Sequence, residues 1–327
     1  MNTALVLSET SEDFQKKFND ILKNYRIIFK EDGNTASIDA DTASEISIIF
    51  GNPKADFLKL CPKLKWIQLQ SAGANGFIDG ELDHNVLLTC ASGCYGLAVS
   101  EHMIALTLAL VKNLHLYRDV QFAQTWQSRG KVKGIKDSVV LVIGIGDIGS
   151  NYARRMKALG SYIIGVDILN YKKPDYLDEF LPVAKMDEAL GRADIVALAV
   201  PGTKHTTGLI GRTQIAKMKH GAVLINACRG VVVDTEALCD ALESGALNGA
   251  GLDVTDPEPL PPGHRLWKQE KAIITPHIAG GRHLAATWEF IQELCLENAQ
   301  RFVRDEPLKN LVDFKTGYRF PDPALIQ

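Results

Sequence analysis

The hydrophobic pattern is sharpest near the middle of the chain, where two apolar runs flank a helical segment. Val139–Ile143 is an unbroken apolar run, which is typical of a strand buried on both faces of a parallel sheet. Beyond a short glycine-rich stretch, apolar side chains recur at helical spacing as far as Leu159, and Gly160 ends that pattern. A second, largely apolar run, Tyr162–Val166, follows. The pattern predicts a strand–helix–strand unit.

The same alternation extends over most of the chain. Further apolar runs predict strands at Ala4–Leu7, Arg26–Phe29, Ile46–Phe50, Trp66–Leu69, Val86–Thr89, Ile195–Val200, Ala222–Ile225, Gly249–Leu252 and Ala272–Ile274. Amphipathic or apolar helical patterns predict helices at Ser11–Leu22, Ala55–Cys61, Leu97–Leu116 and Leu284–Phe302. Strands that alternate with helices favour parallel sheets. We therefore predict the α/β class, with two parallel-sheet domains of the Rossmann-like or flavodoxin-like kind.

Composition narrows the class of protein. A chain of 327 residues with 46% hydrophobic and 23% charged residues is ordinary for a globular protein of two domains. A net charge of −3 gives no basic surface for nucleic acid or for an anionic membrane. No signal-peptide pattern and no membrane-spanning run occur, so we expect a cytoplasmic protein. The six scattered cysteines predict reduced thiols, and their spacing predicts no metal site.

The central unit carries a glycine motif with a known physical use. Gly144 allows a tight turn, Gly146 lets the backbone approach a pyrophosphate, and Gly149 lets helix and strand pack closely. The pyrophosphate would lie at the positive end of the new helix, beside Asp147. Asp167, at the end of the next strand, would accept hydrogen bonds from ribose hydroxyls. The unit predicts a dinucleotide site.

The acid after the second strand also predicts which dinucleotide binds. Asp167 would repel a 2′-phosphate at close range, and Ile168 rather than an arginine follows it. NAD is therefore predicted over NADP, although Lys172 and Lys173 nearby act in the opposite direction.

Three chemically active residues follow predicted strands on the carboxyl side. Because ligands bind beyond the carboxyl ends of parallel strands, Arg229, Glu258 and His277 should converge on the cofactor edge. There Arg229 would bind a substrate carboxylate and polarise the neighbouring carbonyl. His277 would exchange a proton with the carbonyl oxygen, and Glu258 would orient its imidazole. The alternative is a set of strand ends whose side chains are merely solvated.

Two other segments have alternative interpretations. The loop through Ala72, Gly73 and Ala74 is either an anion-binding nest of backbone N–H groups or a plain loop. Cys228 is next to Arg229, which is compatible with a nucleophile, but no histidine is near it in sequence. Packing is the favoured interpretation of Cys228.

Several segments, in order, resemble the D-isomer-specific 2-hydroxyacid dehydrogenase family. They are VIGIGDIGS, PGTKHTTGLI, LINACRGVVVD, GAGLDVTDPEPLPPGHRLW and ITPHIAGG, and the resemblance extends from QLQSAGANGFID to ENAQRFVRDEPLKNLVD. The resemblance implies an NAD-dependent oxidoreductase that interconverts small 2-keto acids and (R)-2-hydroxy acids. It places the family's catalytic set at Arg229, Glu258 and His277.

The resemblance also implies binding residues. The backbone at Ala72–Gly73, beside Ala74, would bind the substrate carboxylate, and Asp253 would bind the nicotinamide carboxamide. Other residues implied around the cofactor are Ile148, Pro201, Thr206, Ala227, Cys228 and Gly280. The pair Ala74-Asn75 replaces the family's more usual valine and aspartate, which would alter the substrate pocket.

At the level of the whole chain, the resemblance implies an NAD-binding Rossmann domain at 100–283. This domain is inserted into a substrate domain made of 1–99 and 284–327. The resemblance also implies a homodimer built on the cofactor domain and the Leu97–Leu116 helix. Two other functions stay open: a short-form phosphoglycerate dehydrogenase acting on a phosphorylated substrate, and a cofactor-sensing, corepressor-like binding protein. Glyoxylate, hydroxypyruvate and branched or aromatic 2-keto acids are all candidate substrates.

Overall fold

The computed structural model describes residues 2–74, 76–78, 82–168, 172–281 and 284–320. Asn75 and Arg282 lie outside the described residues. The chain forms two compact units, which we describe separately. The first unit comprises Met1–Tyr95 and Leu284–Pro321, and the second contains Gly96–His283.

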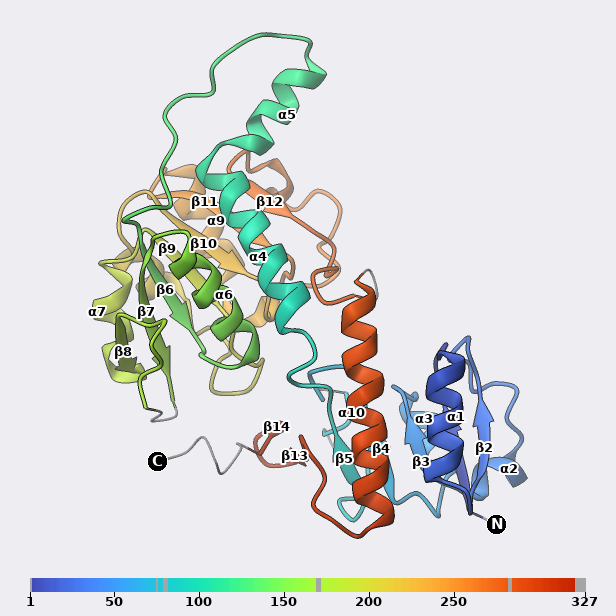
Figure 1. Ribbon diagram of the computed structural model, residues 1–327. Coiled ribbons are helices and arrows are strands. Elements are labelled where there is room, and N and C mark those ends of the chain that lie inside the picture. The colour runs from blue at the N-terminus through green and yellow to red at the C-terminus, as the bar shows by residue number, and fades with distance from the viewer. Residues whose placement is uncertain (1, 75, 79–81, 169–171, 282–283, 321–327) are drawn as a thin grey trace. The chain divides into compact units, whose positions relative to one another are not determined.

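The first unit is built on a five-stranded parallel sheet with strand order β2-β1-β3-β4-β5 (Figure 1). Its strands are β1 (Thr3–Val6), β2 (Arg26–Phe29), β3 (Ile46–Phe50), β4 (Trp66–Gln68) and β5 (Leu87–Thr89). This is the flavodoxin-like order. Because β3 and β4 are buried along their whole length, they form apolar runs in the sequence.

Helices cover both faces of this sheet and create two hydrophobic cores. On one face, α1 (Glu12–Ile21) packs against α10 (Ala285–Val303), and the ring of Phe14 of α1 lies tilted against that of Phe50 of β3, with 5.5 Å between centroids. The opposite face is covered by the short helices α2 (Ala40–Ser44) and α3 (Ala55–Leu58). Side chains alternate between the two cores along β1, as the two-residue period of a strand requires.

A short antiparallel hairpin, β13 (Val312–Asp313) with β14 (Tyr318–Arg319), ends the described part of the first unit. Leu311, just before β13, forms an antiparallel bridge with Thr89 at the end of β5. The hairpin therefore runs back along β5 and returns toward that strand's carboxyl end. Gly317 forms the turn with φ +71°, and a Cβ there would lie 2.5 Å from Ile78.

The second unit is a seven-stranded sheet with order β12-β11-β10-β9-β6-β7-β8, and every neighbouring pair is parallel. Its strands are β6 (Val139–Ile143), β7 (Tyr162–Asp167), β8 (Glu179–Pro182), β9 (Ile195–Leu198), β10 (Ala222–Asn226), β11 (Leu247–Leu252) and β12 (Ala272–Ile274). The chain winds one way from β6 to β8 and the other way from β9 to β12. The topological switch point therefore lies between β6 and β9.

Helices cover both faces of this sheet as well. α4 (Gly96–Val111) and α6 (Asp147–Ala158) pack against each other, and α4 also contacts β10 and β11 (Figure 1). The other core is formed with α7 (Met186–Leu190), α8 (Arg212–Lys217) and α9 (Thr235–Glu243). Three short 3-10 helices complete the described elements: η1 (Val183–Lys185), η2 (Gly230–Val232) and η3 (Arg265–Lys268). The second unit has the predicted α/β architecture with a parallel sheet.

The predicted single helix at Leu97–Leu116 is wrong. The structure has α4, which ends at Val111, and α5 (Leu114–Phe122), bent from it by 67°. The break lies at Asn113, whose backbone is left-handed with φ 56°. The Asn113 amide donates to the carbonyls of Arg129 and Lys131, which holds this conformation. α5 and the loop after it project from the rest of their unit (Figure 1).

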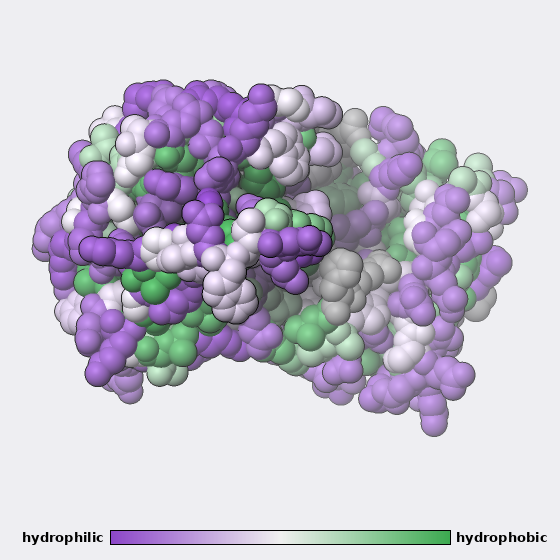
Figure 2. All heavy atoms as spheres, turned by 90° about the horizontal axis from the view of Figure 1, so that it is seen from above, coloured by the Kyte–Doolittle hydropathy of each residue, from purple (hydrophilic) through white to green (hydrophobic). Residues whose placement is uncertain are grey.

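On the face drawn in Figure 2, hydrophilic residues predominate, and hydrophobic residues occur in groups between them. Two of the most exposed large hydrophobic side chains, Phe122 at 72% and Trp126 at 105%, lie on α5 and the loop after it. Among the described residues, no single helix is long and apolar enough to cross a membrane. The bent pair α4–α5 passes that test of length and composition only when its two helices are taken together.

Candidate active site

The glycine motif follows β6 at the switch point and begins α6. Gly144 has φ +93°, and a Cβ there would lie 2.5 Å from the Ala199 carbonyl oxygen. A Cβ on Gly149 would lie 1.9 Å from the Gly144 carbonyl oxygen, so only glycine permits this approach of helix and strand. By contrast, a Cβ on Gly146 would meet no protein atom within 4 Å. The loop thus has the shape that a pyrophosphate at a helix N-terminus requires.

Two acidic side chains lie at this loop. Asp167 ends β7, and its Oδ2 accepts a hydrogen bond from the Ile145 backbone N–H at 2.7 Å. This bond ties the carboxylate to the glycine loop, directly beside the predicted pyrophosphate position. Asp147 is the first residue of α6, and its Oδ1 accepts a hydrogen bond from the Asn151 amide at 3.1 Å. Both acids are therefore at the helix end where anionic side chains are favourable.

The next loop, after β9, is a compact turn held by its own hydroxyls. Thr206 Oγ1 donates to the Pro201 carbonyl at 2.5 Å and accepts from the Thr203 backbone N–H at 2.8 Å. Pro201 and Thr206 thus belong to one rigid loop on the carboxyl side of the sheet, adjacent to the glycine motif. Ile148 is in the first turn of α6.

The loop after β10 carries Arg229 and is organised by Asn226. The Asn226 amide donates to the Arg229 carbonyl at 3.0 Å, and its oxygen accepts from the Cys228 N–H at 3.1 Å. The Arg229 side chain packs over Gly202: a Cβ on Gly202 would lie 2.7 Å from the Cγ of Arg229. Cys228 is buried, and burial raises the pKa of its thiol to about 11. A thiol with this pKa is not a nucleophile at neutral pH.

Close backbone packing brings the next loop against that of Arg229. A Cβ on Gly230 would lie 1.9 Å from the Thr255 carbonyl oxygen, so the loops after β10 and β11 are in contact. Glu258 lies three residues beyond Thr255 in the second of these loops. The loop that carries Glu258 is thus held against the loop that carries Arg229 by backbone contact.

Glu258 and His277 form an ion pair at the carboxyl edge of the sheet. The Glu258 Oε1 and His277 Nδ1 atoms are 2.6 Å apart, and the two side chains are 41% and 47% exposed. His277 follows β12 and has a left-handed backbone, with φ 53°. Such a conformation in a non-glycine residue costs of order 1 kcal/mol or more, and such residues cluster at functional sites. The imidazole therefore presents an oriented, partly exposed Nε2.

Asp253, at the end of β11, is 1% exposed, and both of its carboxylate oxygens accept hydrogen bonds from the His277 loop. Oδ1 accepts from the Thr275 hydroxyl at 2.5 Å and from the Ile278 N–H at 3.0 Å, while Oδ2 accepts from the Ala279 N–H at 2.9 Å. The expected role of Asp253 at the nicotinamide carboxamide stays a prediction, but its role in holding this loop was not expected. Gly280 follows directly in the same loop.

In the first unit, the loop after β4 contains Ala72, Gly73 and Ala74. Ser71 supports the loop, because its Oγ donates to the Gly73 carbonyl at 2.7 Å and accepts from the Asn52 amide at 3.0 Å. Ala74 is buried. In the part of the chain that the structure describes, the Ala72 and Gly73 N–H groups have no protein acceptor. Such backbone donors suit a carboxylate.

Sequence reasoning missed three residues near these loops: Thr275, His102 and Arg319. Thr275 and His102 join the Asp253 network, but a threonine after a strand and a histidine in an apolar helix carry no distinctive signal. Arg319 lies on β14, and its Nε donates to Ser92 Oγ at 3.1 Å. The neighbouring Ala91 N–H donates to the Ser71 carbonyl, so a cation lies one loop away from Ala72. The fold of the C-terminal hairpin produces this placement.

Comparison with known proteins then identifies the family. The model of the D-isomer specific 2-hydroxyacid dehydrogenase NAD-binding domain matches residues 104–279. The chain belongs to the D-isomer specific 2-hydroxyacid dehydrogenase family. It is therefore an oxidoreductase with a Rossmann-type NAD(P)-binding unit, acting on 2-hydroxy or 2-keto acids.

Individual relatives of this dehydrogenase have related names. A glyoxylate reductase from Thermofilum pendens is 30% identical over 280 residues, covering 84% of this chain and 78% of that protein. A D-3-phosphoglycerate dehydrogenase from Archaeoglobus fulgidus is 30% identical over 264 residues, covering 79% of this chain and 49% of that protein. The crystal structure of a D-isomer specific 2-hydroxyacid dehydrogenase from Xanthobacter autotrophicus Py2, in complex with NADPH and MES, superposes with a TM-score of 0.80. It is 25% identical and covers 97% of this chain and 99% of that one.

Proposed function

We propose that this dehydrogenase interconverts 2-keto acids and (R)-2-hydroxy acids with NAD(H), using Arg229, Glu258 and His277. The observation that carries the proposal is the ion pair between Glu258 and His277 at 2.6 Å, on the edge of the sheet that also holds the glycine motif. A histidine oriented by a carboxylate next to a dinucleotide site has the chemistry of a proton donor in carbonyl reduction.

His277 acts as the general acid in reduction and as the general base in oxidation. NADH, held at the glycine loop, would supply the hydride for C2 of the keto acid and would itself become NAD⁺. His277 Nε2 gives its proton to the carbonyl oxygen, so that the C2 carbonyl becomes an alcohol. Glu258, at Nδ1, keeps the ring in one orientation, so that Nε2 faces away from the carboxylate and toward the substrate.

Arg229 binds the substrate carboxylate and polarises the carbonyl. Its guanidinium suits a carboxylate because two parallel N–H···O bonds fix both charge and orientation. In the first unit, the N–H groups of Ala72 and Gly73, beside Ala74, have no protein acceptor among the described residues and would suit a carboxylate. The cofactor is held by the glycine loop, with Asp147, Ile148, Pro201, Thr206, Ala227, Cys228, Asp253 and Gly280 around it.

The preferred cofactor is NAD(H), because Asp167 lies at the glycine loop. Its carboxylate already accepts from Ile145 N–H and would face the adenosine ribose. A 2′-phosphate at the same place would meet this negative charge at short range. The structural relative from Xanthobacter autotrophicus binds NADPH, so the preference needs a direct test.

A homodimer is the assembly we favour, with the projecting α5 segment as its contact. No residue of α5 is buried within the chain, and Phe122 and Trp126 are 72% and 105% exposed. Aromatic residues are enriched in protein–protein interfaces, so these exposed side chains suit a contact with a second copy of the chain. Sedimentation should show a dimer whose dissociation constant rises at least tenfold in the double variant Phe122→Ser, Trp126→Ser. A wild-type monomer would contradict this assembly.

A substrate with a second anionic group, such as a phosphate, is the second candidate, and Arg319 favours it. Among the described residues no carboxylate is paired with Arg319, whose only polar side-chain partner shown is Ser92. Lys59, another cation of the first unit, is by contrast paired with Asp56 at 2.9 Å. Arg319→Gln should raise KM for 3-phosphohydroxypyruvate at least fivefold and leave KM for hydroxypyruvate unchanged.

The decisive experiment follows NADH oxidation by absorbance against a panel of 2-keto acids, each repeated with NADPH. The panel contains glyoxylate, hydroxypyruvate, its 3-phosphate, and branched and aromatic 2-keto acids. Turnover of at least one member, faster with NADH, is expected. If none is turned over while NADH still binds, the proposed reaction is wrong and a cofactor-sensing protein becomes the better account.

A further inference from the structure

We propose that His102 of α4 is a positioning residue for His277, acting through Thr275 and Asp253. The inference builds on the proposed role of His277 as the proton donor. It adds a histidine on another element, which does not touch the His277–Glu258 ion pair in the structure. The one observation behind it is a continuous hydrogen-bonded chain from α4 to the loop that carries His277.

This series of hydrogen bonds begins at the His102 ring. His102 Nε2 lies 2.9 Å from Thr275 Oγ1, and Thr275 Oγ1 lies 2.5 Å from Asp253 Oδ1. A threonine hydroxyl has a single hydrogen, and the Asp253 carboxylate takes it. His102 Nε2 therefore donates to Thr275, which places a proton on Nε2, and the same nitrogen lies 3.6 Å from Asp253 Oδ1. Each donor in the chain thus points toward the Asp253 carboxylate.

The Asp253 residue then fixes the His277 backbone. The His277 N–H donates to the Asp253 carbonyl at 2.8 Å, while the next two N–H groups, of Ile278 and Ala279, donate to its carboxylate at 3.0 and 2.9 Å. These bonds hold His277 in its left-handed conformation, which an isolated chain rarely adopts. The direction of the imidazole toward Glu258 depends on this backbone conformation.

The hydrogen bond from His102 fixes the orientation of the Thr275 hydroxyl, so that this hydroxyl donates to Asp253. Without a donor at Oγ1, this hydroxyl can rotate to other acceptors, and Asp253 loses one of its donors. The Asp253 carboxylate is 1% exposed, so water cannot replace a lost hydrogen bond and the carboxylate is destabilised. We expect the loop to shift in response. A shift of a few tenths of an ångström at His277 would lower the rate of proton transfer without removing the cofactor site.

The test compares a variant that removes the donor with one that keeps it. His102→Leu should lower kcat about tenfold, while KM for NADH changes less than twofold. His102→Gln should restore kcat to within threefold of wild type, because the glutamine amide can place an N–H near the position of Nε2. The matched control is His220→Leu, at an exposed histidine in the turn before β10, which should leave kcat unchanged.

A double-mutant cycle with Thr275→Val separates positioning from general loss of packing. If His102 acts through the Thr275 hydroxyl, His102→Leu should have no further effect on kcat once Thr275 is valine. Independent, multiplying effects of the two substitutions would overturn the proposal. So would a His102→Gln enzyme no more active than His102→Leu while both melt within a few degrees of wild type.

A readout without turnover keeps this inference separate from the proposed reaction. In ¹⁵N-labelled enzyme, His102→Leu should shift the ring nitrogen signals of His277, and His102→Gln should leave them near their wild-type positions. Unchanged His277 signals in His102→Leu would overturn the positioning role. Shifted signals in an enzyme that turns over no 2-keto acid would support the positioning role and contradict the proposed function.

Discussion

Both edges of the seven-stranded sheet carry charged groups, but the two edges use them differently. At the carboxyl edge, Arg229, Glu258 and His277 lie on loops, and the Glu258–His277 pair is more than 40% exposed on both sides. At the amino edge, carboxylates bind backbone N–H groups at the strand starts and cations from neighbouring segments. Charge alone therefore does not mark a functional site in this protein.

The amino edge shows this second use clearly. Asp194 Oδ2 accepts from the Val139 N–H at 3.0 Å, and its Oδ1 binds Lys219 Nζ at 2.7 Å. Asp178 does the same with the Ile163 N–H and Lys157. Each carboxylate joins the start of one strand to a neighbouring segment. These groups stabilise the sheet.

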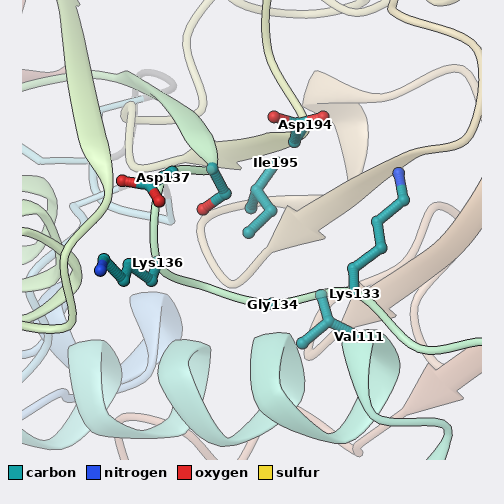
Figure 3. Close-up of a pocket in the computed structure, with 8 residues that line it drawn as sticks. Val111, Lys133, Gly134, Lys136, Asp137, Asp194 and Ile195 are labelled. Carbon is teal, nitrogen blue, oxygen red and sulfur yellow. The ribbon is translucent and has the colours of Figure 1, made fainter.

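A cavity of about 250 Å³ also lies at the amino edge (Figure 3). Val111 of α4, the segment from Lys133 to Ser138, and Asp194 with Ile195 line it. The cavity and the glycine motif lie at opposite ends of β6: the cavity is where β6 and β9 begin, and the motif is where β6 ends. In parallel α/β sheets, ligands bind at the carboxyl edge. The cavity is therefore not the site that the proposed function uses.

The largest expected effect is at the carboxyl edge. His277→Gln removes the proton donor, so kcat should fall by about 10³, within the usual range for general acid catalysis. Affinity for NADH, measured by fluorescence titration, should change less than twofold. Unchanged turnover would remove His277 from its proposed role.

Arg229→Gln should also act at this edge, mainly on substrate. Loss of a bidentate contact to the carboxylate should lower kcat/KM by about 10² or more. Arg229→Lys should recover only part of this, because an ammonium group cannot make the two parallel bonds. Full recovery with lysine would show that charge alone matters there.

Asp167→Ala should change the cofactor ratio rather than the chemistry. We expect the preference for NADH over NADPH, measured as the ratio of kcat/KM values, to fall about tenfold. Part of the effect would come from the lost bond to Ile145 N–H, so both cofactors should bind somewhat more weakly. An unchanged ratio would mean that Asp167 does not discriminate against the 2′-phosphate.

Asp194→Ala tests the amino edge and should affect stability alone. Burial raises the pKa of Asp194, but bonds from Lys219 and the Val139 N–H outweigh it and hold the pKa below its ordinary value of 3.8. The carboxylate therefore stabilises the fold above that pH, and its contribution disappears as pH falls through the lower, folded pKa. At pH 7 the variant should lose about 1–3 kcal/mol of unfolding free energy, with kcat unchanged. If Asp194→Ala lowered kcat while its unfolding free energy equalled that of the wild type, the amino edge would also have a role in activity.

The smallest effect is expected at Cys228. Cys228→Ser should keep kcat within twofold, since serine can preserve the hydrogen bond to the Asn226 oxygen and the thiol pKa of about 11 excludes thiolate chemistry at pH 7. In the wild type, alkylation of this thiol under native conditions should be slow. Rapid alkylation coupled to loss of activity would contradict that view.

The sequence predicted the buried strands best. The run Val139–Ile143 coincides with β6, because a strand buried on both faces leaves an uninterrupted apolar run. The break between α4 and α5 was missed, since local propensity favours a continuous helix there. Tertiary bonds from Asn113 to the segment at Arg129–Lys131 override that propensity. The short strand β8 was also missed, because its few residues lack a clear period.

For the site, the rule that functional residues lie beyond the carboxyl ends of parallel strands predicted that Glu258 and His277 would converge. Their side chains are in contact. It did not predict what supports them. The bonds from Asp253 to the His277 loop depend on which backbone N–H groups turn inward, and no pattern of residue types encodes that turn. Arg319 was equally hidden, because its approach to Ser92 depends on a hairpin that returns along β5.

The central claim is that the carboxyl edge carries out hydride transfer to a 2-keto acid with His277 as the proton donor. The most direct measurement uses NADH that carries deuterium at both C4 positions, with the best substrate of the panel, followed by analysis of the product. We predict the (R)-2-hydroxy acid with deuterium at C2, formed by the wild type and almost absent with His277→Gln. A product of (S) configuration, a product without deuterium, or an equal yield from His277→Gln would contradict the account.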